Sequence, residues 1–164
     1  MARLPQRARL HRGLVALLFL AGLEVGRELA LLARVPLLEA AGVDLIMAGH
    51  SHCYERSAIV KGVFGYGSAP DHVVPDRETL RNDGRILHDN GDQYEVARGE
   101  GSLYVVVGHG GAGVGLRGEH PLMDRFDDQH GSLLLTIDQR SLLRENVVSN
   151  GEVMDRLLLL RPTP

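Results

Sequence analysis

The sequence has little of several features that would indicate a particular class of protein. Cys53 is the sole cysteine among 164 residues, so no disulfide can form within the chain. The formal net charge is −3 and Lys61 is the only lysine, so the sequence lacks the basic excess that predicts nucleic-acid binding. Internal repeats and heptads are also absent. What remains is a composition of 44% hydrophobic and 24% charged residues, which is ordinary for a soluble globular protein.

The first thirty residues contain an apolar stretch that admits three interpretations. Four arginines precede residues 13–23, and this stretch has the length of the apolar region of a signal peptide, which would imply export. Residues 13–20 also have the pattern of a buried strand that a helix follows. A free amphipathic helix is the third interpretation. The stretch is short for a transmembrane span, which needs about 20 apolar residues, so localisation stays open between a secreted and an internal protein.

A helix and then a buried strand are predicted for residues 24–47. Apolar residues recur at helical spacing from Glu24 to Ala41, and Pro36 either ends one helix or begins a second. Gly42 stands where a helix would stop. The apolar run from Val43 to Met47 lies between glycines and is typical of a strand buried on both faces. Gly49 then allows the backbone to leave the sheet sharply.

Two histidines follow this predicted strand directly. Side chains at alternate positions of an extended segment point the same way, so His50 and His52 can reach one point or two adjacent points. Imidazole nitrogens bind first-row metals well, and two metals about 3.5 to 4 Å apart recur in phosphoester hydrolysis. Loop histidines that bond only to the backbone give the same pattern. The carboxyl end of a buried strand is the usual place for a site in layered α/β architecture, which favours the ligand interpretation.

The residues around the two histidines resemble a known motif. The string Ala-Gly-His-Ser-His-Cys-Tyr-Glu-Arg-Ser, from Ala48 to Ser57, resembles the last metal-binding motif of calcineurin-like metallophosphoesterases, in particular of the purple acid phosphatase branch. The strand and glycine turn at 101–111, the loop at 120–123 and the predicted closing strands at 129–138 and 153–160 are similar to that branch as well. The resemblance runs from about residue 30 to the C-terminus.

This resemblance implies a fold and a site. The fold would be α/β, part of a four-layer α/β/β/α sandwich, with residues 1–164 forming the C-terminal half of one metallophosphoesterase domain. His50 would bind one metal ion and His52 the other, the metals being iron with zinc, manganese or iron. Tyr54, Glu55 and Arg56 would fix the orientation of the ligating rings, or Arg56 would simply pair with Glu55 or a nearby carboxylate. The substrate would be a phosphomonoester.

The motifs that come earlier in this family are missing. No Asp-x-His and no Gly-Asn-His precedes His50, and the single Gly-Asp, at Gly91-Asp92, lies downstream of His52. The expected function is therefore a metal-dependent phosphoesterase that is incomplete as this chain, because two ligands are present and the bridging carboxylate is not. The alternative is a non-catalytic remnant or interaction module that self-associates or pairs with a chain supplying the missing half. A simple metal-binding module is a third hypothesis.

Other polar residues are weaker candidates. Residues 62–101 are predicted to form a long polar loop, in which His72, His88 and the scattered aspartates are solvated. The turn at 108–113 either presents backbone N–H groups to a phosphate or is only a connection, which makes His109 a minor candidate. Cys53 and His130 are assigned to packing and to local backbone contacts.

Overall fold

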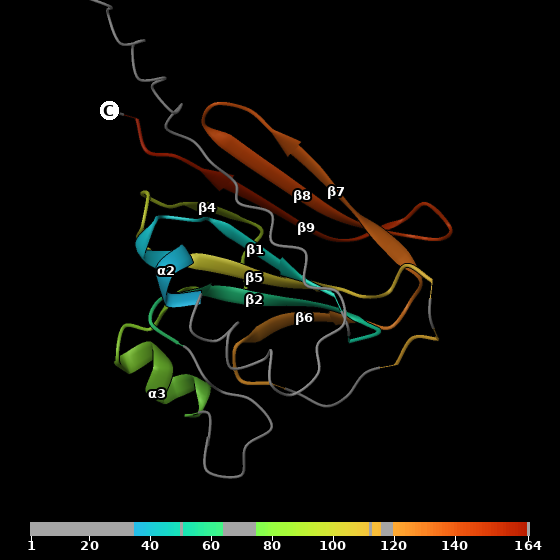
Figure 1. The fold of residues 1–164 in the computed structure, drawn as a ribbon, viewed down its shortest axis with the longest axis horizontal. Coiled ribbons are helices and arrows are strands. Elements are labelled where there is room, and N and C mark those ends of the chain that lie inside the picture. Colours follow the sequence, from blue (N-terminus) through green and yellow to red (C-terminus); the bar gives the residue numbers. More distant parts are fainter. Residues whose placement is uncertain (1–34, 50, 64–74, 112, 116–119, 164) are drawn as a thin grey trace, which may run out of the picture.

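The computed structural model describes residues 35–49, 51–63, 75–111, 113–115 and 120–163. These residues form two mixed β-sheets with short helices (Figure 1). Sheet A has the strand order β1-β5-β2-β3, with β6 also paired to β2, and sheet B has the order β4-β9-β8-β7. The strands are β1 (Leu45–Ala48), β2 (Tyr54–Val60), β3 (Ile86–His88), β4 (Gln93–Glu95), β5 (Ser102–Val107), β6 (Met123–Asp127), β7 (Gly131–Ile137), β8 (Ser141–Val148) and β9 (Val153–Leu160). The helices are α2 (Val35–Ala40) and α3 (Arg77–Asn82).

Some predicted features lie outside the described residues. They are the possible signal-like segment or strand within residues 1–30, most of the predicted helix before Val35, and the side chains of His50 and His72. In the part of the chain that the structure describes, no helix is long and apolar enough to cross a membrane.

Helix α2 leads into β1 as the sequence predicts. Pro36 lies within α2, and the helix continues to Ala40, so Pro36 does not end the helix that leads to Gly42. Gly42 follows the helix with φ 75°, a left-handed conformation that favours glycine. The N–H of Gly42 donates to Glu39 and that of Val43 donates to Leu38, which is the hydrogen-bond pattern of a Schellman stop.

Strand β1 is buried and parallel to β5, with Leu45 opposite Leu103 and Ala48 opposite Val106. Leu45, Ile46 and Met47 are all buried. The prediction of a buried strand at this position is confirmed, although its assigned bounds begin two residues later than Val43. Burial on both faces explains the continuous apolar run, because neither side of the strand faces water.

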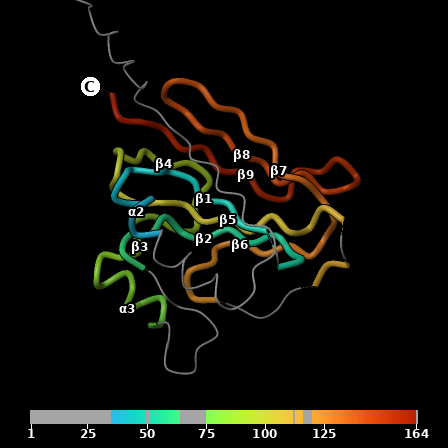
Figure 2. The backbone as a smooth tube through the Cα atoms, viewed as in Figure 1, coloured from blue at the N-terminus to red at the C-terminus, as the bar shows by residue number. Residues whose placement is uncertain are grey.

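The core lies between the inner faces of the two sheets, which lie one against the other in Figure 2. Strand β8 shows strict alternation, with every second side chain from Leu142 to Val148 buried and its neighbours more exposed. The register shift in β2 between Arg56 and Ile59 lets Tyr54 and Ile59, an odd number of positions apart, pack into the same core. The buried cluster consists of Leu45, Met47, Tyr54, Ile59, Val96, Leu103, Val105, Leu142, Leu157 and Leu159.

A second, smaller core covers the other face of sheet A. Leu80 of α3 packs there with Ala58 and Val60 of β2, while Glu39 of α2 accepts a hydrogen bond from the Tyr104 hydroxyl at 2.7 Å. The described helices therefore contact sheet A. The described residues show mixed β-sheets with few, short helices, and the four-layer sandwich stays an expectation.

The prediction of one long polar loop over residues 62–101 is wrong where the structure describes that segment. It contains α3, β3 and β4, and Leu80, Ile86 and Val96 are buried. Asp76 caps α3 by accepting a hydrogen bond from the Thr79 N–H at 2.9 Å. These elements are only three to six residues long, too short for a hydrophobic period to show in the sequence.

Candidate functional site

The turn that joins β1 to β2 carries the predicted metal ligands. It begins at the carboxyl end of β1, the position that the sequence predicts, and His52 is exposed there. The role of His52 as a ligand stays a prediction, and His50 lies outside the described residues. The burial of β1 makes this turn the terminus of a rigid element, which is a suitable base for positioning a side chain.

A second glycine-rich segment holds this turn in place. The Gly108 N–H donates to the carbonyl of Cys53 at 3.1 Å, and the Gly115 N–H donates to the carbonyl of His52 at 3.0 Å. A Cβ atom added to Gly108 would lie 1.7 Å from the Ser51 carbonyl oxygen, so only glycine fits. The N–H groups of Gly108 and Gly115 are therefore already bonded to the ligand turn. This favours the interpretation of the glycine-rich segment as a connection over its interpretation as a phosphate-binding turn.

Tyr54 and Arg56 turn away from the exposed His52 into the space between the sheets. Both are fully buried and both donate to Asp155 Oδ2 of β9, Tyr54 from its hydroxyl at 2.7 Å and Arg56 from Nε at 2.8 Å. Arg144 of β8 donates to the same oxygen at 2.5 Å and also contacts the Tyr54 hydroxyl. Asp155 therefore ties β2, β8 and β9 together beneath the ligand turn.

The charges of this cluster shift the pKa values of its members. Burial on its own would raise the pKa of Asp155, but Arg144 together with the hydrogen bonds from Arg56 and Tyr54 outweighs burial and holds that pKa below its ordinary value. Burial raises the pKa of Tyr54 well above its usual range, so Tyr54 stays a neutral hydroxyl donor. Burial lowers the pKa of the Arg144 guanidinium, against the opposing effect of Tyr54 and Asp155.

The same network continues through sheet A to α3. Arg56 NH1 lies 3.6 Å from Asp124 Oδ2, and both side chains are fully buried. Asp124 also binds Arg77 of α3, which in turn pairs with Asp89 at 3.0 Å. Positive and negative side chains therefore alternate across the molecule in the order Arg144, Asp155, Arg56, Asp124, Arg77, Asp89 and Arg81. Arg56 pairs with these aspartates, in agreement with the alternative that assigns it to a nearby carboxylate.

Glu55 lies between Tyr54 and Arg56 on β2, so its side chain points to the opposite face of the strand. Its carboxylate accepts from the Sγ of the buried Cys53 at 3.3 Å. Burial lowers the pKa of the His120 imidazole, and the negative charge of Glu55 partly opposes this shift. His120 lines an open recess of about 390 Å³ with Arg77, Pro121, Met123 and Phe126.

His109 is 1% exposed and belongs to a buried hydrogen-bond chain. Its Nε2 lies 2.8 Å from Asn146 Oδ1, and Asn146 Nδ2 donates to Asp127 Oδ2 at 3.0 Å. Its ring lies 5.5 Å from that of Tyr54, centroid to centroid. His109 therefore joins β5, β8 and β6 rather than facing an open phosphate turn.

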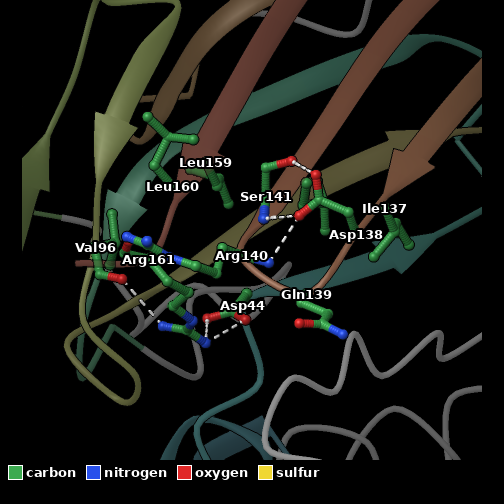
Figure 3. Close-up of a pocket in the computed structure, with 11 residues that line it drawn as sticks. Asp44, Val96, Ile137, Asp138, Gln139, Arg140, Ser141, Leu159, Leu160 and Arg161 are labelled. Carbon is green, nitrogen blue, oxygen red and sulfur yellow. Dashed lines mark hydrogen bonds and ion pairs between the residues drawn. The ribbon is translucent and has the colours of Figure 1, made fainter. Parts of the chain in front are cut away.

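A small pocket lies at the other end of β1, near Asp44 (Figure 3). Its volume is about 40 Å³, which has room for little more than a water molecule or two. Arg161 spans it, donating from NH1 to the Val96 carbonyl at 3.0 Å and from NH2 to Asp44 Oδ1 at 2.6 Å. Because Asp44 precedes β1 and His52 follows it, this pocket is separate from the ligand turn.

The described residues do not complete a two-metal site. Among them, no group of three or more histidine, cysteine, aspartate or glutamate side chains is placed to hold a metal ion. The one Asp-x-His string of the chain, Asp128-Gln129-His130, lies downstream of His52 and between β6 and β7. A bridged pair of metals needs a carboxylate grouped with the histidines, and the described residues contain no such group.

Comparison with known proteins places the fold. No protein-family model matches the sequence, and no curated protein matches it. Among solved structures, the chain is similar to the purple acid phosphatase PPD1 isolated from yellow lupin (Lupinus luteus) seeds, with a TM-score of 0.56 and 24% sequence identity. The match covers 78% of this chain and 19% of the lupin chain. The chain therefore shares the fold of part of a purple acid phosphatase and spans about a fifth of that chain's length.

The partners of Tyr54 and Arg56 were not predicted from the sequence. Arg144 and Asn146 occupy positions of β8 that point inward together with Leu142 and Val148. Asp155 does the same on β9, in phase with the buried Leu157. A charged residue on the apolar phase of an alternating strand is the pattern that would have indicated a buried ion pair.

Proposed function

We propose that this chain carries the last ligand-bearing turn of a metal-dependent phosphoesterase site, acting on phosphomonoesters. In this proposal His50 and His52 each bind one of two metal ions, iron with zinc, manganese or iron. One observation carries it. The motif that resembles the phosphatase ligands lies at the carboxyl end of a buried strand, in a chain whose fold matches part of a purple acid phosphatase.

The role of the neighbouring residues is to hold the turn rather than to react. Tyr54 and Arg56 anchor the start of β2 to Asp155, so the backbone on one side of the turn is fixed from within the core. Gly108 fixes the other side by its contact with Ser51 and Cys53. A turn clamped in this way loses little entropy when its side chains bind an ion, which is what preorganisation requires.

Catalysis needs more ligands than the two histidines. A bound metal supplies a hydroxide nucleophile and charge stabilisation at phosphorus, and a pair of metals needs a bridging carboxylate for geometry and charge balance. The remaining ligands therefore come from residues beyond those described or from a second chain. The described part on its own is expected to bind metal weakly.

Metal binding at the turn can be tested by nuclear magnetic resonance with Mn²⁺ as the probe. The proposal predicts that Mn²⁺ first broadens the amide signals of Ser51, His52 and Cys53. Replacing both turn histidines, His50→Ala and His52→Ala, should remove this broadening, whereas His130→Ala should leave it unchanged. Broadening that persists without the turn histidines, or that centres first on Asp128 and His130, would contradict the proposal.

A second function, that of an interaction module without catalysis, rests on a different observation. Sheet B carries large apolar side chains that are about half exposed, namely Leu134, Ile137, Val153 and Met154. Exposed apolar surface of this kind marks contact sites in many proteins. The two functions are compatible, because these residues lie on sheet B and the ligand turn belongs to sheet A.

A further inference from the structure

Arg56 lies between two buried carboxylates and forms hydrogen bonds with only one of them. Asp155 accepts from Arg56 Nε at 2.8 Å and from NH2 at 3.4 Å. On the other side, Asp124 Oδ2 lies 3.6 Å from NH1, and both side chains are fully buried. Among the described residues, NH1 has no hydrogen-bond partner. A buried donor without an acceptor costs free energy, so Arg56 is held with one group unsatisfied beside Asp124.

Asp124 is satisfied by donors other than Arg56. Arg77, the first residue of α3, binds Oδ1 from NH2, and the Asn90 N–H donates to Oδ2 at 2.8 Å. Arg77 therefore supplies the positive charge that compensates this buried carboxylate. With Asp124 compensated in this way, Arg56 keeps its hydrogen bonds to Asp155.

The position of Arg56 matters for the ligand turn because the two are close along the chain. Arg56 is the third residue of β2, and His52 lies four residues before it, in the turn. Tyr54, between them, donates to the same Asp155 oxygen as Arg56 does. A move of Arg56 away from Asp155 would therefore shift the start of the strand into which the turn leads.

A small displacement is enough to exchange one carboxylate for the other. A charge-assisted N–H···O bond is about 2.7 to 2.9 Å long, so NH1 needs to move by less than about 1 Å to bind Asp124. Without Arg77, Asp124 would be a buried charge whose one remaining described ion pair is with Arg56. An uncompensated buried charge is strongly unfavourable, which would draw Arg56 toward Asp124.

We propose that Arg77 is a positioning residue for the ligand turn, acting through Asp124 and Arg56. By compensating Asp124, Arg77 leaves Arg56 bound to Asp155 and so fixes the start of β2. Helix α3 and the ligand turn are thereby coupled, although α3 and sheet B lie on opposite sides of β2 (Figure 1). The consequence for metal binding rests on the proposed function, whereas the coupling itself does not.

Substitution of Arg77 tests the coupling by nuclear magnetic resonance without metal. Arg77→Gln removes the charge that compensates Asp124, so Arg56 should move. The Nε–Hε signal of the Arg56 side chain and the amide signals of Ser51 and His52 should therefore shift from their native positions.

The matched control is Arg81→Gln in the same helix. Arg81 lies one turn after Arg77 on α3 and also binds Asp89, donating from Nε at 2.9 Å, but none of its described contacts is with Asp124. Arg81→Gln should therefore leave the signals of Arg56 and of the turn in place. Equal shifts in the two variants would overturn the proposal.

Removing the charge of Asp124 as well separates positioning from the packing of α3. In the double variant Arg77→Gln/Asp124→Asn the buried negative charge is gone, so Arg56 should return to Asp155 and its signals to their native positions. A purely structural role of Arg77 predicts a larger disturbance in the double variant than in the single one, and that result would overturn the proposal. If Arg77→Gln alone does not fold, the double variant should fold, and its failure to do so would also contradict the proposal.

Mn²⁺ binding measures the consequence for the site. The dissociation constant for Mn²⁺ at the ligand turn should rise about two- to thirty-fold in Arg77→Gln, the range for residues that modulate a site from a distance, and should return toward the native value in the double variant. A native chain that binds Mn²⁺ at the turn no more tightly than Arg77→Gln does would overturn the positioning role. The shifts of Arg56 and of the turn are measured without metal, so failure of the proposed function would leave that result standing.

Discussion

Asp155 is the residue on which the interior of this protein most depends. It is a buried carboxylate that three side chains from two strands satisfy, and two of these carry a positive charge. A buried ion pair adds little net stability when it is intact, because removing its charges from water costs about as much as their attraction returns. Removing one partner of the pair destabilises the fold far more, because the remaining charge stays buried without an opposite charge beside it.

The substitution Asp155→Asn should therefore destabilise the fold strongly. It keeps the shape of the side chain but leaves Arg56 and Arg144 facing one another without a negative charge, at a cost of about 3 to 5 kcal/mol. The free energy of unfolding, measured in urea, checks this. Asp92→Asn, at an exposed aspartate, is the matched control and should leave stability unchanged. Equal free energies of unfolding for the two variants would show that the charge of Asp155 does not contribute to the stability of the fold.

The same residue makes stability depend on pH. The pKa of Asp155 is lowered in the folded state from an ordinary value of 3.8, so the folded protein holds its proton less tightly than the unfolded chain. Stability from this group is present above the unfolded pKa and is lost as pH falls below that value and through the lowered folded pKa. Unfolding free energies over this range should fall less steeply for Asp155→Asn than for the native protein. If the free energy of unfolding falls equally steeply with pH in both proteins, Asp155 is not the source of this pH dependence.

The two turns at the carboxyl ends of β1 and β5 pack together and form one structural unit. The turn after β1 supplies His52, and the turn after β5 supplies the glycine against which it rests. Both strands are parallel neighbours in sheet A, so their carboxyl ends meet at the same edge. The packing of one turn against the other is what fixes the candidate ligand.

Replacing Gly108 by alanine should disturb this unit. The new Cβ atom would lie 1.7 Å from the Ser51 carbonyl oxygen, and since that neighbour is backbone, one of the two turns must move. Overpacking of this kind costs about 1 to 3 kcal/mol. Amide chemical shifts of Ser51 to Cys53 should change, whereas Gly110→Ala, whose added atom would come no closer than 3.7 Å to a neighbour, should leave them alone. Unchanged shifts in Gly108→Ala would mean that the turns are not coupled.

The strands that the sequence predicts well are of two kinds. Strands β7 and β9 were expected because their sequences resemble the closing strands of the phosphatase branch, and β1 was expected because it is a continuous apolar run. The segment from α3 to β4 was mistaken for a loop, because each of its elements has at most six residues. The contacts of Arg56 were beyond the sequence for another reason: Asp155 lies 99 residues away, and only the packing of the two sheets brings them together.

At the scale of the whole molecule, a line of alternating charges connects the interior of sheet B with α3 on the far side of sheet A. The two ends of β1 are distinct, with a small pocket at the first and the candidate ligand turn at the second. Under the proposed function, a phosphoesterase site would form at the second end once further ligands, a bridging carboxylate among them, approach it.

The rate of phosphomonoester hydrolysis tests this account most directly. The chain is assayed with p-nitrophenyl phosphate and added iron, zinc or manganese, first alone and then with a segment that supplies Asp-x-His, Gly-Asp and Gly-Asn-His. We expect a rate near background for the 164-residue chain alone, turnover once the segment is supplied, and loss of most of that turnover in His52→Ala but not in His130→Ala. Metal-dependent hydrolysis by the chain alone that survives His52→Ala would contradict it.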